Sequence, residues 1–254
     1  MIEATGRLVP LVTPFTDDQS TVSEVRLARA MMRLRNSGVE GYVVCSDAGE
    51  FTTLSISERK HVLELVMREN QTGLPVLVNV SAISSNIALD LAQHAKRHGA
   101  RGIIAIPPYY GQFTQAEIAV HFRFIANHGG LPLLRFVLEN QYGTIDHELL
   151  KDHTGIRTVD PAFEDAIWEN PSLDEFSFGE ITCTPMGLLA MFGEVIAEEK
   201  ESFKNAFQTY GTARVIKALG DLMDFEQGPP RTPVQPIPHE LAVMLASKFS
   251  KIAA

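Results

Sequence analysis

The chain has 254 residues, of which 45% are hydrophobic and 21% are charged. This composition is typical of a globular protein and argues against a disordered, collagen-like or disulfide-stapled chain. With 22 Lys and Arg against 31 Asp and Glu, the formal net charge is −9. Because an acidic chain without a basic run is poorly suited to bind nucleic acid or an acidic membrane, we expect neither partner.

The sequence also bears on the compartment. Its start has no basic segment followed by an apolar one, as a secretory signal requires, and no apolar run approaches the roughly 20 residues that cross a bilayer. Cys45 and Cys183 both lie in apolar, strand-like runs, where a buried reduced thiol is the expected state. These features predict a cytoplasmic protein.

The first 160 residues alternate short apolar runs with longer amphipathic ones. The apolar runs are rich in Val, Ile and Leu, as buried parallel strands are, and we predict strands at residues 8–12, 41–45, 76–80, 102–106, 131–137 and 155–159. We predict helices at residues 22–37, 57–69, 84–98, 115–128 and 146–152. Repeated strand-helix units predict a parallel sheet with helical crossovers. Five or six of them fit a (βα)8 barrel better than a two-layer sandwich, and a doubly wound sheet is the alternative that stays open.

Terminal signals support several of these helices. Gly38, Gly99 and Gly129 follow predicted helices where a left-handed C-cap is favoured. A helix start is predicted at Ser57, and a capping box at Thr114 and Glu117.

After residue 160 the alternation weakens. We predict a helix at 163–169, strands at 175–178 and 181–184, a helical stretch at 186–225 broken near Gly193 and Gly211, and a final helix at 239–251 after a Pro-rich connector. Since parallel strands need a crossover, the short gap between the last two strands puts barrel closure around strands seven and eight in doubt. We expect a barrel over residues 1–190 and C-terminal helices packed on it over residues 191–254.

A set of short segments occurs in a familiar order. They are residues 6–15 (GRLVPLVTPF), 38–41 (GVEG), 46–50 (SDAGE), 53–54 (TL), 58–59 (ER), 74–78 (LPVLV), 99–102 (GARG), 107–110 (PPYY), 121–122 (HF), 131–134 (LPLL) and 235–238 (QPIP). In this order they resemble the dihydrodipicolinate synthase / N-acetylneuraminate lyase family, well up to residue 137 and in patches beyond. The resemblance implies a class I aldolase-type (βα)8 barrel, Schiff-base chemistry with pyruvate, no cofactor or metal, and a homo-oligomer (dimer or tetramer).

The resemblance breaks at the position of the imine-forming lysine. The family carries it at the end of the sixth strand in a segment like Gly-Ile-Lys-Glu, whereas this chain has Gly155-Ile-Arg157-Thr. An arginine stays protonated, with its nitrogen delocalised into the guanidinium, so it cannot form the imine. All eight lysines fall in predicted helical or terminal segments, and Lys151 is the nearest alternative.

Other site positions differ as well. Arg135 stands where the resemblance places a proton-relaying tyrosine, and Asp47 and Ala48 replace a carboxylate-binding pair of threonines. Gly49 is kept, and Glu50 is expected to be a structural hydrogen-bonding residue. Of the pair Tyr109 and Tyr110, the resemblance implies that the second reaches a neighbouring subunit's site.

The candidate site therefore has Arg157, Arg135 and Tyr110 as catalytic residues and Asp47, Ala48 and Gly49 as substrate-binding residues. Two guanidiniums can bind the carboxylate of a ligand, or they can form an internal salt bridge with Asp47.

Three functions stay open. The first is a lyase or isomerase that acts on a small 2-oxo or carboxylic acid by general acid–base catalysis, without a Schiff base. The second is a non-catalytic binding or assembly protein on the same scaffold, and the third is a conventional Schiff-base lyase that uses another lysine.

His94 and His98 have metal-capable spacing, but a solvated helix face is the expected explanation.

Overall fold

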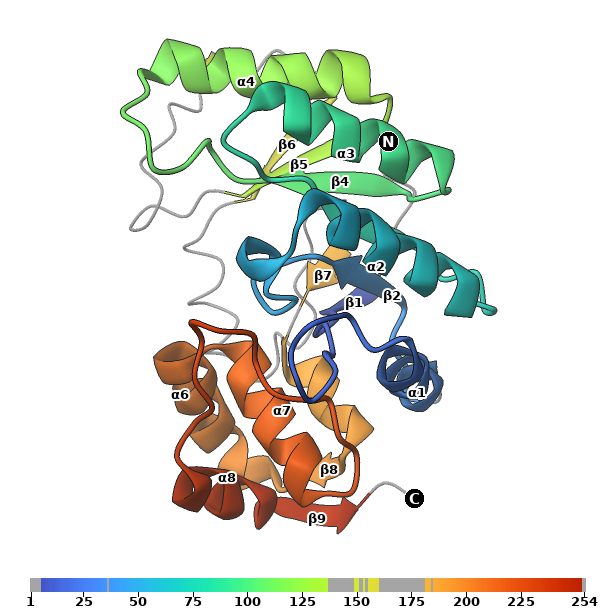
Figure 1. The fold of residues 1–254 in the computed structure, drawn as a ribbon, viewed down its shortest axis with the longest axis vertical. Helices are drawn as coiled ribbons and strands as arrows, with labels where there is room; N and C mark the ends of the chain where they lie inside the picture. Colours follow the sequence, from blue (N-terminus) through green and yellow to red (C-terminus); the bar gives the residue numbers. More distant parts are fainter. Residues whose placement is uncertain are drawn as a thin grey trace. The chain divides into compact units, whose positions relative to one another are not determined.

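A computed structural model describes residues 6–35, 37–136, 149–150, 153, 155–159, 181–183 and 185–252 (Figure 1). The chain divides into two compact units. We call Met1–Gly6 with Pro75–Thr182 the central unit, and Arg7–Leu74 with Cys183–Ala254 the terminal unit. The domain boundary at residue 190 stays a prediction.

The central unit is built on four parallel strands. These are β3 (Val76–Asn79), β4 (Gly102–Ala105), β5 (Leu133–Phe136) and β6 (Ile156–Val159), each paired with the next. The helices α3 (Ser85–Arg97) and α4 (Gln115–Gly129) follow β3 and β4, as crossover connections require (Figure 1). The strands and helices predicted between residues 76 and 137, and the strand predicted at 155–159, are thus confirmed, with ends shifted by one or two residues.

The register of these strands separates the two faces of the sheet. Ile103 faces α4, because its Cδ1 atom lies 3.6 Å from where a Cβ on Gly129 would stand. Leu133 is the register partner of Ile103, so it belongs to the same, helix-covered face. Since successive residues alternate between faces, Ile104 and its partner Leu134 belong to the opposite face, which in a barrel is the interior.

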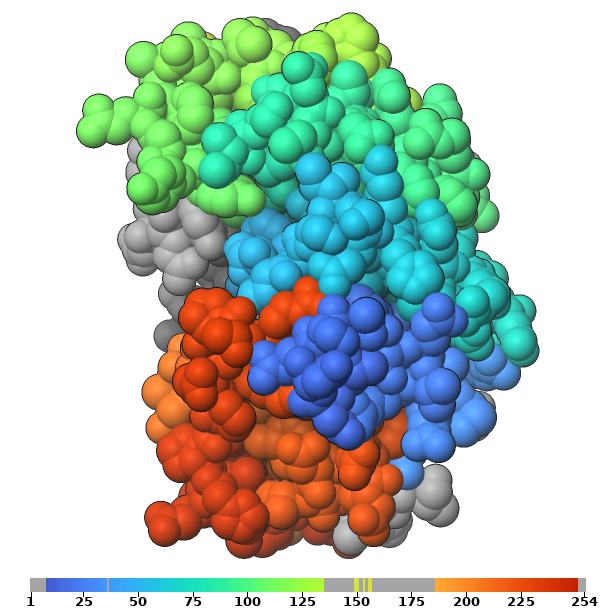
Figure 2. Space-filling model, in the orientation of Figure 1, coloured from blue at the N-terminus to red at the C-terminus, as the bar shows by residue number. Residues whose placement is uncertain are grey.

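The terminal unit combines the start and the end of the chain. β1 (Gly6–Pro10) pairs in parallel with β2 (Gly41–Val44), and the helices are α1 (Glu24–Arg35), α2 (Ile56–Glu69), α6 (Lys200–Tyr210), α7 (Thr212–Leu222) and α8 (His239–Ala246). Phe192 and Phe203 are fully buried, and both make edge-to-face contacts with Phe249. These contacts join α6 to the last segment of the chain. Figure 2 shows the first residues of this unit (blue) beside its Pro-rich segment (red).

The prediction for the C-terminal part was partly wrong. The stretch 186–225 is not helical throughout: a 3-10 helix (Pro185–Met191), strand β8 (Gly193–Val195) and a second 3-10 helix (Ala197–Glu199) precede α6. The final helix ends at Ala246, and β9 (Phe249–Ile252) then pairs antiparallel with β8. The breaks near Gly193 and Gly211 are confirmed.

The other predicted strands, helix ends and caps agree only in part with the structure. β7 (Ile181–Cys183) confirms the strand predicted at 181–184, whereas residues 163–169 and 175–178 lie outside the described residues, as does most of 146–152. Gly38 and Gly99 have the expected positive φ, but after α4 that role falls to Gly130, not Gly129. The helix expected to start at Ser57 begins at Ile56, with Ser55 as its cap.

In the part of the chain that the structure describes, no helix is both long enough and apolar enough to span a membrane.

Candidate functional site

The loop over residues 46–50 follows the C-terminal end of β2, the end at which barrel enzymes carry their sites. Two backbone hydrogen bonds fold it into a turn, from Gly49 N to Ser46 O and from Glu50 N to Asp47 O. The hydroxyl of Thr13 donates to Gly49 O at 2.8 Å. The structure therefore brings the three predicted binding residues Asp47, Ala48 and Gly49 together in one turn.

Each of these three residues has a different environment. Ala48 and Gly49 are buried, and a Cβ on Gly49 would lie 3.1 Å from Leu11 O, so a larger side chain would crowd the backbone. Asp47 is exposed, yet the protein atoms around its carboxyl desolvate it and raise its pKa above the usual value. The loop thus offers a carboxyl that takes a proton more readily than an ordinary aspartate.

Tyr110 lies in the loop that follows β4. Its side chain is 100% exposed, and its φ of 73° is in the left-handed region that non-glycine residues seldom adopt. Tyr109 is partly buried. The tyrosine expected to act in a neighbouring subunit is therefore the outward one of the pair.

The two arginines occupy neighbouring strands of the central unit. Arg157 in β6 is the register partner of Leu134, and Arg135 in β5 is the partner of Thr158. The position of Arg157 thus belongs to the interior face together with Leu134, and the position of Arg135 belongs to the helix-covered face. The side chains of both arginines lie outside the described residues.

A buried ion pair in the terminal unit was not predicted. Lys217 of α7 and Glu50 are almost fully buried, and Lys217 Nζ donates to Glu50 Oε1 at 2.5 Å and to Pro229 O at 3.1 Å. Burial lowers the pKa of Lys217 to about 8, although the charge of Glu50 raises it. A signal was present in the sequence, because Lys217 is a single charge among the apolar residues 215–219 of a helix.

Glu50 confirms its expected structural role. Its Oε2 accepts the backbone N–H of Arg231 at 3.0 Å, and its φ of 54° closes the turn before a 3-10 helix, Phe51–Thr53. The carboxylate therefore has partners on both oxygens, as a buried charge requires.

The other lysines stay in helical or terminal segments as predicted. Lys60 lies in α2, Lys96 in α3, Lys200 and Lys204 in α6, Lys248 after α8, and Lys251 in β9. Lys151 lies outside the described residues. None of the described lysines lies in a strand of the parallel sheets.

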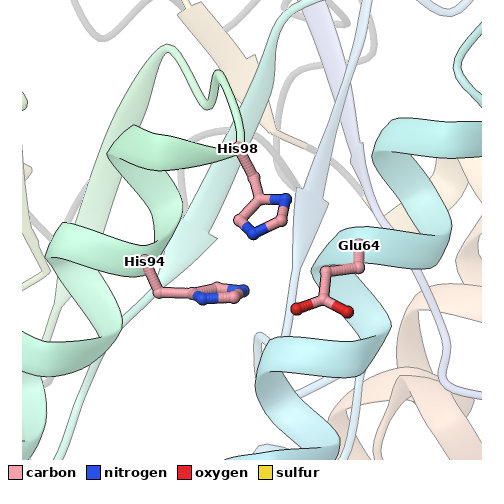
Figure 3. A group of neighbouring side chains, drawn as sticks. All are labelled: Glu64, His94 and His98. Atoms are coloured by element: carbon pink, nitrogen blue, oxygen red, sulfur yellow. The ribbon is translucent and has the colours of Figure 1, made fainter.

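The two histidines with metal-capable spacing, His94 and His98, differ in burial. His94 lies in the last turn of α3 and His98 is the residue that caps its C-terminus, with ring centroids 4.3 Å apart (Figure 3). The expected solvated face is wrong for His94, which is buried, and correct for His98, which is exposed.

Cys45 is a buried free thiol whose pKa is raised to about 11 by burial, as an unreactive cysteine requires.

Comparison with known proteins gives consistent matches. The family model for the dihydrodipicolinate synthetase family matches residues 3–143. The chain is 25% identical to the 4-hydroxy-tetrahydrodipicolinate synthase of Methanopyrus kandleri, over 97% of this chain and 96% of that protein. It is 31% identical to the synthase of Nitratidesulfovibrio vulgaris and 32% identical to an uncharacterised DapA-like lyase of Pyrococcus horikoshii, spanning about half the length of each.

Solved structures show the same fold. The 4-hydroxy-tetrahydrodipicolinate synthase of Methylacidiphilum fumariolicum matches with a TM-score of 0.77 at 16% identity, over 97% of this chain and 95% of that chain. A catalytic lysine mutant of the sialic acid aldolase of Ruminococcus gnavus matches with a TM-score of 0.75 at 17% identity, over 96% and 95% of the two chains. The fold is thus a (βα)8 barrel of the aldolase type, and the chain belongs to the dihydrodipicolinate synthetase family.

Proposed function

We propose that this protein binds a small 2-oxo or carboxylic acid and acts on it as a lyase or isomerase without forming a Schiff base. Arg157 binds the ligand carboxylate, the loop with Asp47, Ala48 and Gly49 takes part in binding, and Asp47 or Tyr110 moves the proton. The protein is a cytoplasmic homo-oligomer that needs no cofactor or metal.

The observation that carries this proposal is the position of Arg157. It stands in the sixth strand, in the segment that resembles the family's lysine segment, and its register position belongs to the interior face. A guanidinium there would keep its charge at any physiological pH and offer a planar pair of donors that matches a carboxylate. A carboxylic acid is therefore a more suitable ligand than a neutral carbonyl compound.

Asp47 and Tyr110 are the two candidates for the proton-moving group. Desolvation raises the pKa of Asp47, which brings this carboxyl closer to the range in which a general acid or base works. For binding the ligand carboxylate, Arg135 is a weaker candidate than Arg157, because its register position belongs to the other face of the sheet.

Two other functions make different predictions. A conventional Schiff-base lyase would need another lysine to supply the amine that Arg157 cannot. Lys217 is unsuited, because its amine already binds Glu50 and Pro229 in a buried site. A non-catalytic binding or assembly protein would keep the fold and the oligomer without turning over any 2-oxo acid.

Borohydride trapping tests the chemistry. After incubation with pyruvate and borohydride, we expect the mass of the intact protein to stay unchanged, because Arg157 cannot form an imine. The Arg157→Lys variant places an amine at the same interior position and should gain one pyruvate adduct. An adduct on the unaltered protein would favour the Schiff-base function instead, and its loss in Lys151→Arg would assign it to Lys151.

Calorimetric titration with pyruvate tests the binding role. We expect Arg157→Ala to weaken binding roughly 10- to 100-fold, the effect of losing hydrogen bonds to a charged ligand. Arg97→Ala is the matched control, since Arg97 is an exposed arginine at the end of α3. Equal binding by both variants would contradict the role of Arg157, and a folded protein that binds no 2-oxo acid would favour the non-catalytic function.

A further inference from the structure

The C-terminal part of the terminal unit reaches the loop over residues 46–50 through buried charges. We call Glu50, Lys217 and Arg231 the Glu50 cluster. Lys217 binds one carboxylate oxygen of Glu50, and the backbone N–H of Arg231 binds the other. The cluster thus joins the turn after β2 to α7 and to the Pro-rich segment, which lie far later in the sequence.

Arg231 is itself held from several sides. Its guanidinium donates to the backbone oxygens of Gln19, Ser20 and Thr53, and to Glu58 Oε1 at 2.7 Å. The ring of Phe15 supports both cations, with Lys217 Nζ 4.2 Å and Arg231 Cζ 4.1 Å from its centroid. Each buried charge therefore has a partner of opposite sign, Lys217 with Glu50 and Arg231 with Glu58.

The turn itself leaves Glu50 little freedom to move alone. A Cβ on Gly49 would lie only 3.1 Å from Leu11 O, so the turn packs close to the segment that follows β1, and the Thr13 hydroxyl donates to the carbonyl of Gly49. A displacement of the Glu50 carboxylate would therefore be passed on to Ala48 and Asp47, its close neighbours in the same turn.

We propose that Lys217 and Arg231 are positioning residues, which act through Glu50 to hold Asp47 and Ala48 in the conformation that binds the ligand. The inference rests on the proposed function, because that function assigns the loop to ligand binding. Lys217 touches no ligand in this role. If its charge is lost, Glu50 stays buried with one partner fewer, and the turn rearranges to bring the carboxylate toward water.

The test combines a methyl probe of the loop with pyruvate binding. Ala48 is buried in the loop, and its methyl signal in a carbon-13 alanine-labelled sample reports on the conformation of the turn. The methyl of Ala206, buried in α6, serves as the internal reference. In Lys217→Met we expect the Ala48 signal to shift and pyruvate binding to weaken at least 10-fold, whereas Lys204→Met, a control in α6, should change neither.

A titration of the unaltered protein covers the case in which Lys217→Met does not fold. The charged groups that act on Lys217 are Glu50, Arg231 and Asp221. As the pH rises through about 8, Lys217 loses its proton, so the Ala48 signal should shift and pyruvate affinity should fall together while Ala206 stays unchanged.

The outcomes separate the two proposals. An Ala48 signal that responds neither to Lys217→Met nor to pH overturns the positioning role, whatever happens to pyruvate. A shifted Ala48 signal with unchanged pyruvate affinity also overturns it. If Ala48 responds but the unaltered protein binds no pyruvate, the coupling of Lys217 to the loop is supported and the proposed function fails.

Discussion

His121 is a buried imidazole in α4 that is kept neutral by its surroundings. Its side chain is 3% exposed, its Nδ1 lies 2.8 Å from the hydroxyl of Ser85, and among the described residues its Nε2 has no hydrogen-bond partner. Desolvation lowers its pKa from 6.5 to about 4. Because the unfolded chain binds a proton more readily, the stability that neutral His121 contributes is complete above pH 6.5 and is lost as the pH falls toward 4.

We therefore expect the free energy of unfolding to fall between pH 7 and pH 5, by about 2 kcal/mol more in the unaltered protein than in His121→Asn. Asparagine keeps a polar group near Ser85 but does not titrate. Urea unfolding at the two pH values measures the difference. The absolute stability of the variant is not the criterion, and equal pH dependence of both proteins would contradict the buried, neutral state of His121.

Predictions for single residues were right where the neighbouring sequence determines the environment of a side chain. Pairings were missed where a residue far away in the sequence supplies the partner. The unreactive state of Cys45 follows from the apolar run in which it lies, whereas the structural role of Glu50 depends on Lys217 and Arg231. The pairing of Glu50 with Lys217 joins positions 167 residues apart, so no local pattern could specify it. The opposite faces of Arg135 and Arg157 depend on strand register, which the sequence leaves open by one residue.

At the scale of elements, the start of α2 provides a direct test of a local signal. Ser55 accepts the backbone N–H of Glu58, and the Glu58 carboxylate accepts the N–H of Ser55 at 2.8 Å. The expected start at Ser57 was wrong, because the serine that lies three residues before a glutamate is Ser55. We expect Ser55→Ala to lower the free energy of unfolding by about 1 kcal/mol.

Ser57→Ala is the matched control for this prediction. Ser57 is exposed in the first turn of the same helix, and its hydroxyl contacts only the Ser55 hydroxyl among the hydrogen bonds of the described residues. We expect a change within about 0.5 kcal/mol, as for most surface substitutions. The urea unfolding midpoints of Ser55→Ala and Ser57→Ala measure this difference in stability. A larger effect of Ser57→Ala would show that the cap was assigned to the wrong serine.

The elements themselves were predictable to different degrees. Apolar runs bounded by turns located the strands β1 to β6 to within a few residues. For β1 to β5 the reason is that their described side chains are buried on both faces of the sheet. β8 and β9 were missed because each has three or four residues and gains its hydrogen bonds from a partner more than 50 residues away. The sequence pattern across both strands is helical, and the strands form only because β8 and β9 pair with each other.

For the whole molecule, the order of the segments and their resemblance to the family predicted the barrel. The similar structures confirm that fold even though identity is below 25%. Composition and periodicity alone left a doubly wound sheet open, since both folds repeat the same strand-helix unit. That the barrel is incomplete around strands seven and eight stays a prediction, because residues 160–180 lie outside the described part.

Assembly is the last property that belongs to this scale. Tyr110 exposes its whole side chain on a strained backbone, and the family resemblance implies that this tyrosine reaches a neighbouring subunit. We expect light scattering to give a mass that is a multiple of 28.0 kDa. Truncating a tyrosine at the centre of an interface costs about 2 kcal/mol or more, so Tyr110→Ser should weaken association roughly 30-fold in a dilution series.

Val25→Ser is the control for the assembly prediction, because Val25 is an exposed apolar residue of α1, 63% accessible, for which no such role is expected. It should leave the mass unchanged at all concentrations. If Tyr110 also completes a neighbour's site, Tyr110→Ser should weaken pyruvate binding even at concentrations at which the oligomer persists. A monomeric unaltered protein that binds pyruvate with full affinity would exclude any role for Tyr110 in a neighbouring site, and proton transfer would then fall to Asp47.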